Sequence, residues 1–201
     1  MKRRNALIVF VLIVTIVLIA DRVTKIVAVE QLTGHPPIAF LPLLLDFALV
    51  YNTGGAFGLF AGGGYLFVFV AIAAFAVIVI YLWRASDLLP AIVIALSLIG
   101  GGALGNAYDR AFAGAVPDFI HTIFIEFPVF NIADIALTLG EILLLVAVTI
   151  LWFKPRPQAG AGQQLEPLAG SEVLGASGLA SAGEPLAAGE PLDGQAGELE
   201  E

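Results

Sequence analysis

Residues 66–83 read LFVFVAIAAFAVIVIYLW, a run without a single charged side chain. A helix needs roughly 20 apolar residues to cross the ~30 Å hydrocarbon core of a bilayer, so this run predicts a membrane-spanning helix. Similar apolar runs occupy residues 88–105 and 132–153. A fourth run, residues 6–20, is long enough if its helix continues past Asp21. The sequence therefore predicts a membrane all-α fold, a bundle of four transmembrane helices.

The composition agrees with lipid as the main solvent of this chain. Hydrophobic residues make up 59% of the sequence and charged residues 13%, whereas soluble domains average about 45–50% and about 25%. The chain contains no cysteine. This excludes disulfides, thiolate nucleophiles and metal sites with cysteine ligands.

The negative net charge belongs to the end of the chain. The formal charge is −8, yet the first 156 residues contain nine basic and nine acidic side chains. The remainder is rich in Gly, Ala, Pro, Leu and Glu, a composition that cannot form a packed core. We expect one membrane domain at residues 1–155 and a disordered acidic cytoplasmic tail at residues 156–201. Acidity confined to a tail does not indicate a nucleic-acid partner, and we expect none.

The basic residues predict the orientation of the spans, because cytoplasmic flanks carry an excess of Lys and Arg. If both termini are cytoplasmic, six basic residues fall inside: Lys2, Arg3, Arg4, Arg84, Lys154 and Arg156. Three fall outside: Arg22, Lys25 and Arg110. The segments 30–65 and 107–131 then face outward. Within the first, residues 44–51 predict a short strand of a small extracytoplasmic β-element, and the glycines of residues 54–64 predict a mobile outer loop.

The first apolar run also resembles a secretory signal peptide, because it follows Lys2, Arg3 and Arg4. No small-residue cleavage site of the A-x-A type follows it, and three more spans lie downstream. A retained first span is therefore the favoured interpretation.

Polar side chains gather near the outward ends of the spans, where lipid should reject them. They are Asp21, Lys25, Asn106, Asp109, Arg110 and Asp134, with Asp118 in the adjoining loop. Transport pathways usually distribute such residues through the midplane, whereas one interfacial layer suits chemistry on a substrate anchored in lipid. A small non-enzymatic carrier or ion pathway remains the alternative.

Most of these residues also have structural explanations. Asp21 and Lys25 are four residues apart and can pair on one helix face. The group at residues 106–110 can hold the end of its helix against neighbouring spans, which we favour over catalysis on spacing alone. Asp134 lies three residues after Asn131, in the pattern of a capping box. From the residues alone, capping and catalysis are equally good explanations of Asp134.

The available nucleophiles narrow the possible chemistry. No serine lies in the outward layer, which disfavours a serine hydrolase. His121 follows Asp118 by three residues, so a metal-dependent hydrolase using Asp118, His121 and Asp134 is a second alternative. What remains is a pair of carboxylates, of which one keeps its proton and the other activates water.

Four segments, taken together and in order, resemble the bacterial lipoprotein signal peptidases, also called signal peptidase II. They are residues 21–25 (DRVTK), 52–57 (NTGGAF), 101–110 (GGALGNAYDR), and 116–120 (VPDFI) with 130–134 (FNIAD). The resemblance covers about residues 5–154 and includes the four-span scaffold.

The resemblance implies an aspartic endopeptidase with Asp118 and Asp134 as its catalytic dyad and with no cofactor or metal. It also implies supporting or substrate-binding residues: Asp21, Lys25, Asn52, Gly102, Asn106, Asp109, Arg110, Asn131 and Ala133. The implied substrate is a prolipoprotein whose Cys carries a diacylglyceryl group, cleaved just before that Cys. We expect a globomycin-sensitive monomer, surrounded by lipid in the bacterial cytoplasmic membrane, with its site near the extracytoplasmic face.

Overall fold

The computed structural model describes residues 1–55 and 62–154. The predicted tail and most of the predicted mobile loop lie outside these residues. The chain divides into two units, residues 1–156 and residues 157–201, and every described residue belongs to the first.

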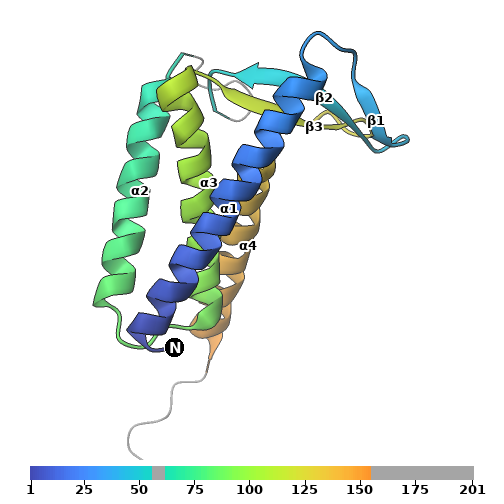
Figure 1. Cartoon of the computed structure of the whole chain (residues 1–201). Coiled ribbons are helices and arrows are strands. Elements are labelled where there is room, and N and C mark those ends of the chain that lie inside the picture. The colour runs from blue at the N-terminus through green and yellow to red at the C-terminus, as the bar shows by residue number, and fades with distance from the viewer. Residues whose placement is uncertain (56–61, 155–201) are drawn as a thin grey trace, which may run out of the picture. The chain divides into compact units, whose positions relative to one another are not determined.

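Four long helices form the body of this unit (Figure 1). They are α1 (Arg3–Leu32), α2 (Gly64–Arg84), α3 (Pro90–Ala113) and α4 (Ile132–Phe153). Each is long and apolar enough to cross a membrane, and large apolar side chains such as Ile16 and Leu145 are exposed on their outer faces. A bundle with an apolar exterior of this length is suited to lipid. The predicted bundle of four spans is confirmed.

A small antiparallel sheet lies across the end of the bundle where α1 and α3 end and α4 begins (Figure 1). Its strands are β1 (Ile38–Leu41), β2 (Leu45–Asn52) and β3 (Val116–Thr122), in the order β1-β2-β3. The predicted strand at residues 44–51 corresponds to β2. Phe119 of β3 packs with Ala28 and Leu32 of α1, which attaches the sheet to the bundle.

Local sequence signals account for several helix ends. Pro90 stands at the start of α3, where its missing N–H leaves no helical hydrogen bond unmade. Gly114 follows α3 with φ of 75°, the left-handed conformation that glycine adopts at little cost. Asn131 caps α4 in a complete capping box with Asp134, as the sequence predicts.

Small residues bring α3 and α4 into close contact. A Cβ atom placed on Gly102 would overlap the carbonyl oxygen of Ala133. A Cβ atom on Gly140 would lie 2.8 Å from the carbonyl oxygen of Ala95. Close approach through small residues is a common way for helices to pack in a membrane. Here it places the C-terminal half of α3 against the start of α4.

Two details differ from the sequence-based expectation. Asp118 was expected in a solvated loop, but it lies in β3 and its residue is only 2% exposed. Asp21 and Lys25 were expected at the end of the first span, but α1 continues to Leu32. The helix extends because its last turns bury Ala28 and Leu32 against the sheet.

Candidate active site

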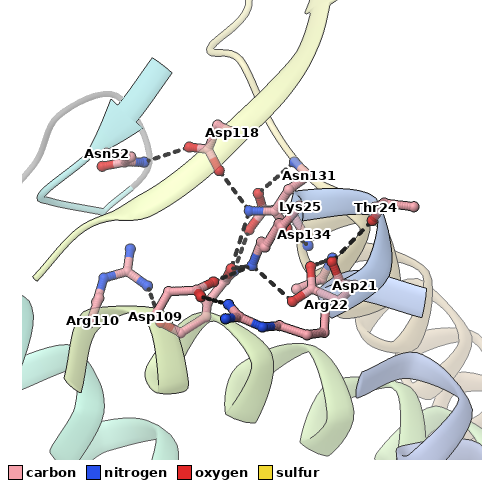
Figure 2. A network of polar contacts seen from close by, with 12 residues as sticks. Asp21, Arg22, Thr24, Lys25, Asn52, Asp109, Arg110, Asp118, Asn131 and Asp134 are labelled. Carbon is pink, nitrogen blue, oxygen red and sulfur yellow. Dashed lines mark hydrogen bonds and ion pairs between the residues drawn. The ribbon is translucent and has the colours of Figure 1, made fainter. Parts of the chain in front are cut away.

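Polar side chains from α1, α3, α4 and the sheet meet in one network at the sheet end of the bundle (Figure 2). At its centre, Asp118 and Asp134 are both bonded to Asn131. The Nδ2 atom of Asn131 donates to Oδ1 of Asp118 at 2.6 Å. Its main-chain N–H donates to Oδ2 of Asp134 at 3.0 Å. One residue therefore holds two carboxylates that are sixteen positions apart in the sequence.

Asp118 is a buried carboxyl with two amide donors. Besides Asn131, the Nδ2 atom of Asn52 in β2 donates to its Oδ2 at 3.1 Å. Burial raises the pKa of Asp118 to about 6, and the negative charge of Asp134 adds to this rise. The hydrogen bonds from Asn52 and Asn131 act in the opposite direction. A carboxyl with a pKa of this size can keep or release its proton near neutral pH.

Asp134 stands at the first turn of α4 and is half-buried. Its Oδ1 accepts a hydrogen bond from Nδ2 of Asn106 at 2.7 Å. Its main-chain N–H donates to Oδ1 of Asn131 at 3.1 Å, which completes the capping box. Asp134 can therefore both cap α4 and belong to the carboxylate pair. Its Oδ2 takes part in the capping box, and its Oδ1 accepts from Asn106.

Lys25 joins α1 to α3 from within the network. Its Nζ lies 2.8 Å from Asp21, 2.9 Å from Asn106 and 2.7 Å from Asp109. The side chain of Lys25 is 1% exposed, so all three of its protons are used inside the protein. The other carboxylate oxygen of Asp21 accepts the main-chain N–H of Ala133 at 3.1 Å. Three helices are thereby fixed in register beneath the carboxylate pair.

Arg110 occupies the side of the site next to β2. Its guanidinium donates to the carbonyl oxygen of Gly54 at 2.5 Å and lies 4.9 Å from the ring centre of Phe67. These contacts connect α3 to the residues just after β2 and to the first turn of α2. Arg110 therefore ties the end of α3 to the chain after β2 and to α2.

The structure brings together every residue that the sequence predicted for the site. Gly102 has no polar role there, but it allows Ala133 to come close. Arg22 lies outside this set, with its side chain half-exposed at the edge of the network, and its guanidinium lies 3.3 Å from Asp109 and 5.2 Å from the ring centre of Tyr108. No local pattern signals this pair, because its two members are 87 positions apart.

The geometry disfavours the two alternative functions. His121 turns its Nδ1 to Asp46 at 2.8 Å, and no hydrogen bond joins it to Asp118 or Asp134. Within residues 1–55 and 62–154, no three His, Asp or Glu side chains are grouped as a metal site requires. Glu141, about 10 Å deeper than Asp134 on α4, is exposed on the outer surface of that helix. Its position does not mark a polar path through the interior of the bundle.

An apolar groove of about 650 Å³ lies between α1, α2 and α3. Asp21, Arg22 and Asp109 contribute to its wall, but Asp118 and Asp134 do not. The groove therefore adjoins the polar network on the side of Asp21 and Asp109, and it does not contain the carboxylate pair.

The comparisons with known proteins point to one family. A family model described as signal peptidase (SPase) II matches residues 13–150. A lipoprotein signal peptidase of Acinetobacter baumannii is 40% identical over 147 residues, which cover 70% of this chain and 82% of the relative. A lipoprotein signal peptidase of Symbiobacterium thermophilum is 35% identical over 143 residues, covering 70% and 94%.

Solved structures agree with the sequence relatives. A bacterial membrane enzyme solved at 2.3 Å resolution has a TM-score of 0.67 and 32% identity to this chain. The match covers 76% of this chain and 94% of the solved one. A second such structure, solved at 1.9 Å resolution, has a TM-score of 0.64 and 34% identity.

Proposed function

The chain belongs to the signal peptidase II family, and from this membership we propose that it is a membrane aspartic endopeptidase that removes the signal peptides of prolipoproteins. It is a multi-pass protein of the bacterial inner membrane, as its family and its four apolar helices indicate. We further propose Asp118 and Asp134 as the catalytic dyad. The observation that carries this proposal is the position of Asn131, which bonds directly to both carboxylates.

The dyad would hydrolyse the scissile amide through a bound water molecule. Two close carboxylates do not both ionise cheaply, so one keeps a proton. The ionised carboxylate takes a proton from water, and the water oxygen attacks the amide carbon. The protonated carboxyl donates to the carbonyl oxygen as negative charge develops there. When the intermediate collapses, the proton taken from water passes to the leaving amine, and the carbonyl re-forms as the other proton returns to the dyad.

We further propose that the substrate is a prolipoprotein with a diacylglyceryl group on the Cys that follows the scissile bond. The acyl chains would hold that bond near the membrane interface, at the depth of the carboxylate layer. Anchoring the substrate at the depth of the dyad lowers the entropic cost of bringing the reacting groups together. A single chain contains the complete dyad, so a monomer suffices for this reaction.

The proposed orientation places both termini in the cytoplasm and the site near the extracytoplasmic face. Lys2, Arg3, Arg84 and Lys154 all lie at helix ends distant from the sheet. In support, the N-terminus of the chain bonds to the carbonyl oxygen of Leu88 in the link between α2 and α3. Cationic groups gathered at one end of a bundle favour a cytoplasmic location for that end.

The deciding experiment is cleavage of a purified diacylglyceryl-modified prolipoprotein in detergent, with the unmodified precursor beside it. We expect wild type to cut the lipidated substrate, and both Asp118→Asn and Asp134→Asn to lose activity by about a thousandfold or more while still folding and melting cooperatively. An inactive wild type would overturn the proposed function. A nearly active Asn variant would overturn the dyad alone.

A further inference from the structure

Asn106 has only one possible amide orientation, and Lys25 determines it. Lysine has three donor protons and no acceptor, so the atom of Asn106 that lies 2.9 Å from its Nζ must be the carbonyl oxygen. The amide nitrogen of Asn106 then has to face Asp134, at 2.7 Å. Amide orientations are inferred from the surrounding hydrogen bonds, and here the surrounding groups allow a single solution.

The position of Lys25 is itself fixed on both sides. Asp21 and Asp109 each accept one of its protons, and both are buried with it. The third proton is therefore directed at Asn106. Neighbouring hydrogen bonds polarise one another in a low dielectric, so the cation strengthens Asn106 as a donor to Asp134.

The same constraint passes to the second asparagine. The Oδ1 atom of Asn106 also accepts from Nδ2 of Asn131 at 3.1 Å. That nitrogen supplies its other proton to Asp118, and Oδ1 of Asn131 accepts the main-chain N–H of Asp134. Lys25, which touches neither carboxylate of the dyad, and the main-chain N–H of Asp134 therefore require the same donor and acceptor directions in the two asparagines.

The two members of the dyad receive different partners as a result. Both oxygens of Asp134 accept from N–H groups, one polarised by Lys25 and one belonging to the N-terminal end of α4. Asp118 is buried in β3 and, among residues 1–55 and 62–154, accepts hydrogen bonds from two neutral side-chain amides. Burial raises the pKa of Asp118 to about 6, so this carboxyl holds a proton more readily than an ordinary aspartate does.

Building on the proposed function, we propose that Lys25 is a positioning residue. Acting through Asn106, it makes Asp134 the carboxylate that accepts a proton from water and leaves Asp118 as the acid that donates to the substrate carbonyl.

Two neutral substitutions separate hydrogen-bond direction from charge. Lys25→Gln and Lys25→Met remove the same charge and have similar lengths, but only glutamine can still donate to Oδ1 of Asn106. Removing a buried cation leaves two carboxylates uncompensated and can prevent folding. Both substitutions are therefore made together with Asp109→Asn, which restores the charge balance, and Asp109→Asn alone serves as their reference.

The measured quantities are kcat, KM and the melting temperature, with lipidated prolipoprotein as substrate. We expect kcat of the Lys25→Gln, Asp109→Asn protein (the Gln protein) to be about tenfold higher than kcat of the Lys25→Met, Asp109→Asn protein (the Met protein). One hydrogen bond to a charged network contributes about this much. The KM values of the two proteins should agree within about threefold. In the Met protein, Oδ1 of Asn106 has lost the donor from residue 25, so the amide of Asn106 is a weaker donor to Asp134. A role in stability alone would change the melting temperature but leave the two kcat values equal.

Arg22→Gln is the matched control in the otherwise unchanged protein. It removes one positive charge from the same helix and the same partner, Asp109, but Arg22 has no hydrogen bond to Asn106. We expect its kcat to stay within about threefold of wild type. Equal kcat for the Gln and Met proteins, or a large kcat loss in Arg22→Gln, would overturn the inference while the proposed function stands. An inactive wild type would overturn the proposed function itself.

Discussion

Asn131 donates its side-chain amide to Asp118 at 2.6 Å, and the same side chain caps α4, which carries Asp134 in its first turn. The residue is fully buried. A capping interaction that stabilises α4 thus also aligns the proposed dyad, and the two roles can be separated by substitution.

Asn131→Ser tests this separation. Serine keeps a capping oxygen but lacks the amide donor to Asp118, so we expect a melting temperature near wild type and a loss of kcat of about tenfold or more. Asn131→Ala removes both interactions and should in addition lose about 1 kcal/mol of stability. Cleavage at the wild-type rate by Asn131→Ser would show that the bond to Asp118 is dispensable.

The raised pKa of Asp118 predicts a pH-dependent stability. The folded protein binds this proton up to a pH of about 6, whereas the unfolded chain releases it near the ordinary aspartate pKa of 3.8. The folded state therefore holds more protons between these values, and the free energy of unfolding falls as pH rises through the window, by on the order of 2–3 kcal/mol.

This contribution is measured by comparing wild type with Asp118→Asn in melting experiments from pH 4 to pH 7. The free energy of unfolding of Asp118→Asn should increase relative to that of wild type as pH rises. This difference should become constant above a pH of about 6. Asp87→Asn, which changes a carboxyl in the link between α2 and α3, is the control for a general effect of lost charge. A difference between wild type and Asp118→Asn that does not vary with pH would contradict the prediction.

The close approach at Gly102 predicts a strong effect of a single methyl group. Gly102→Ala would press a Cβ atom against the main chain of Ala133, and we expect it to cost about 1–3 kcal/mol and most of the activity. Gly100→Ala is the matched control, because its Cβ would lie 3.2 Å from the ring of Phe75, a side chain that can shift. Equal melting temperatures for the two variants would mean that α3 and α4 separate easily.

The pairing of His121 with Asp46 predicts that cleavage does not depend on a metal ion. His121→Ala should retain activity within about threefold, because it removes a partly exposed pair at a distance from the dyad. Incubation with EDTA should leave the rate unchanged. Loss of cleavage in EDTA, restored by added zinc, would bring back the metal-dependent alternative.

The absence of cysteine from the sequence allows a direct test of orientation. Leu43→Cys places a thiol in the exposed turn between β1 and β2, and Ser86→Cys places one between α2 and α3. In intact cells, an impermeant maleimide should label the first and not the second. Labelling of Ser86→Cys alone would reverse the proposed topology.

Several features could be predicted from the sequence because their causes are local. Membrane spans depend on the hydropathy of about 20 neighbouring residues, and the capping box depends on two residues three positions apart. The strand β2 follows from the pattern of its own residues. For these features, neighbours in the chain are also neighbours in the structure.

The burial of Asp118 and the partners of Lys25 were decided by the tertiary structure. Asp118 becomes a buried strand residue because β3 pairs with β2, about 66 positions earlier. For Lys25, the sequence predicts the local partner Asp21 alone. Its other partners, Asn106 and Asp109, are 81 and 84 positions away. By itself, the sequence determined the spans, the cap and a set of polar residues at one end of them. Which of those residues touch depends on the packing of α1, α3, α4 and the sheet, because hydrogen bonds act over about 3 Å and no local periodicity specifies contacts between distant segments.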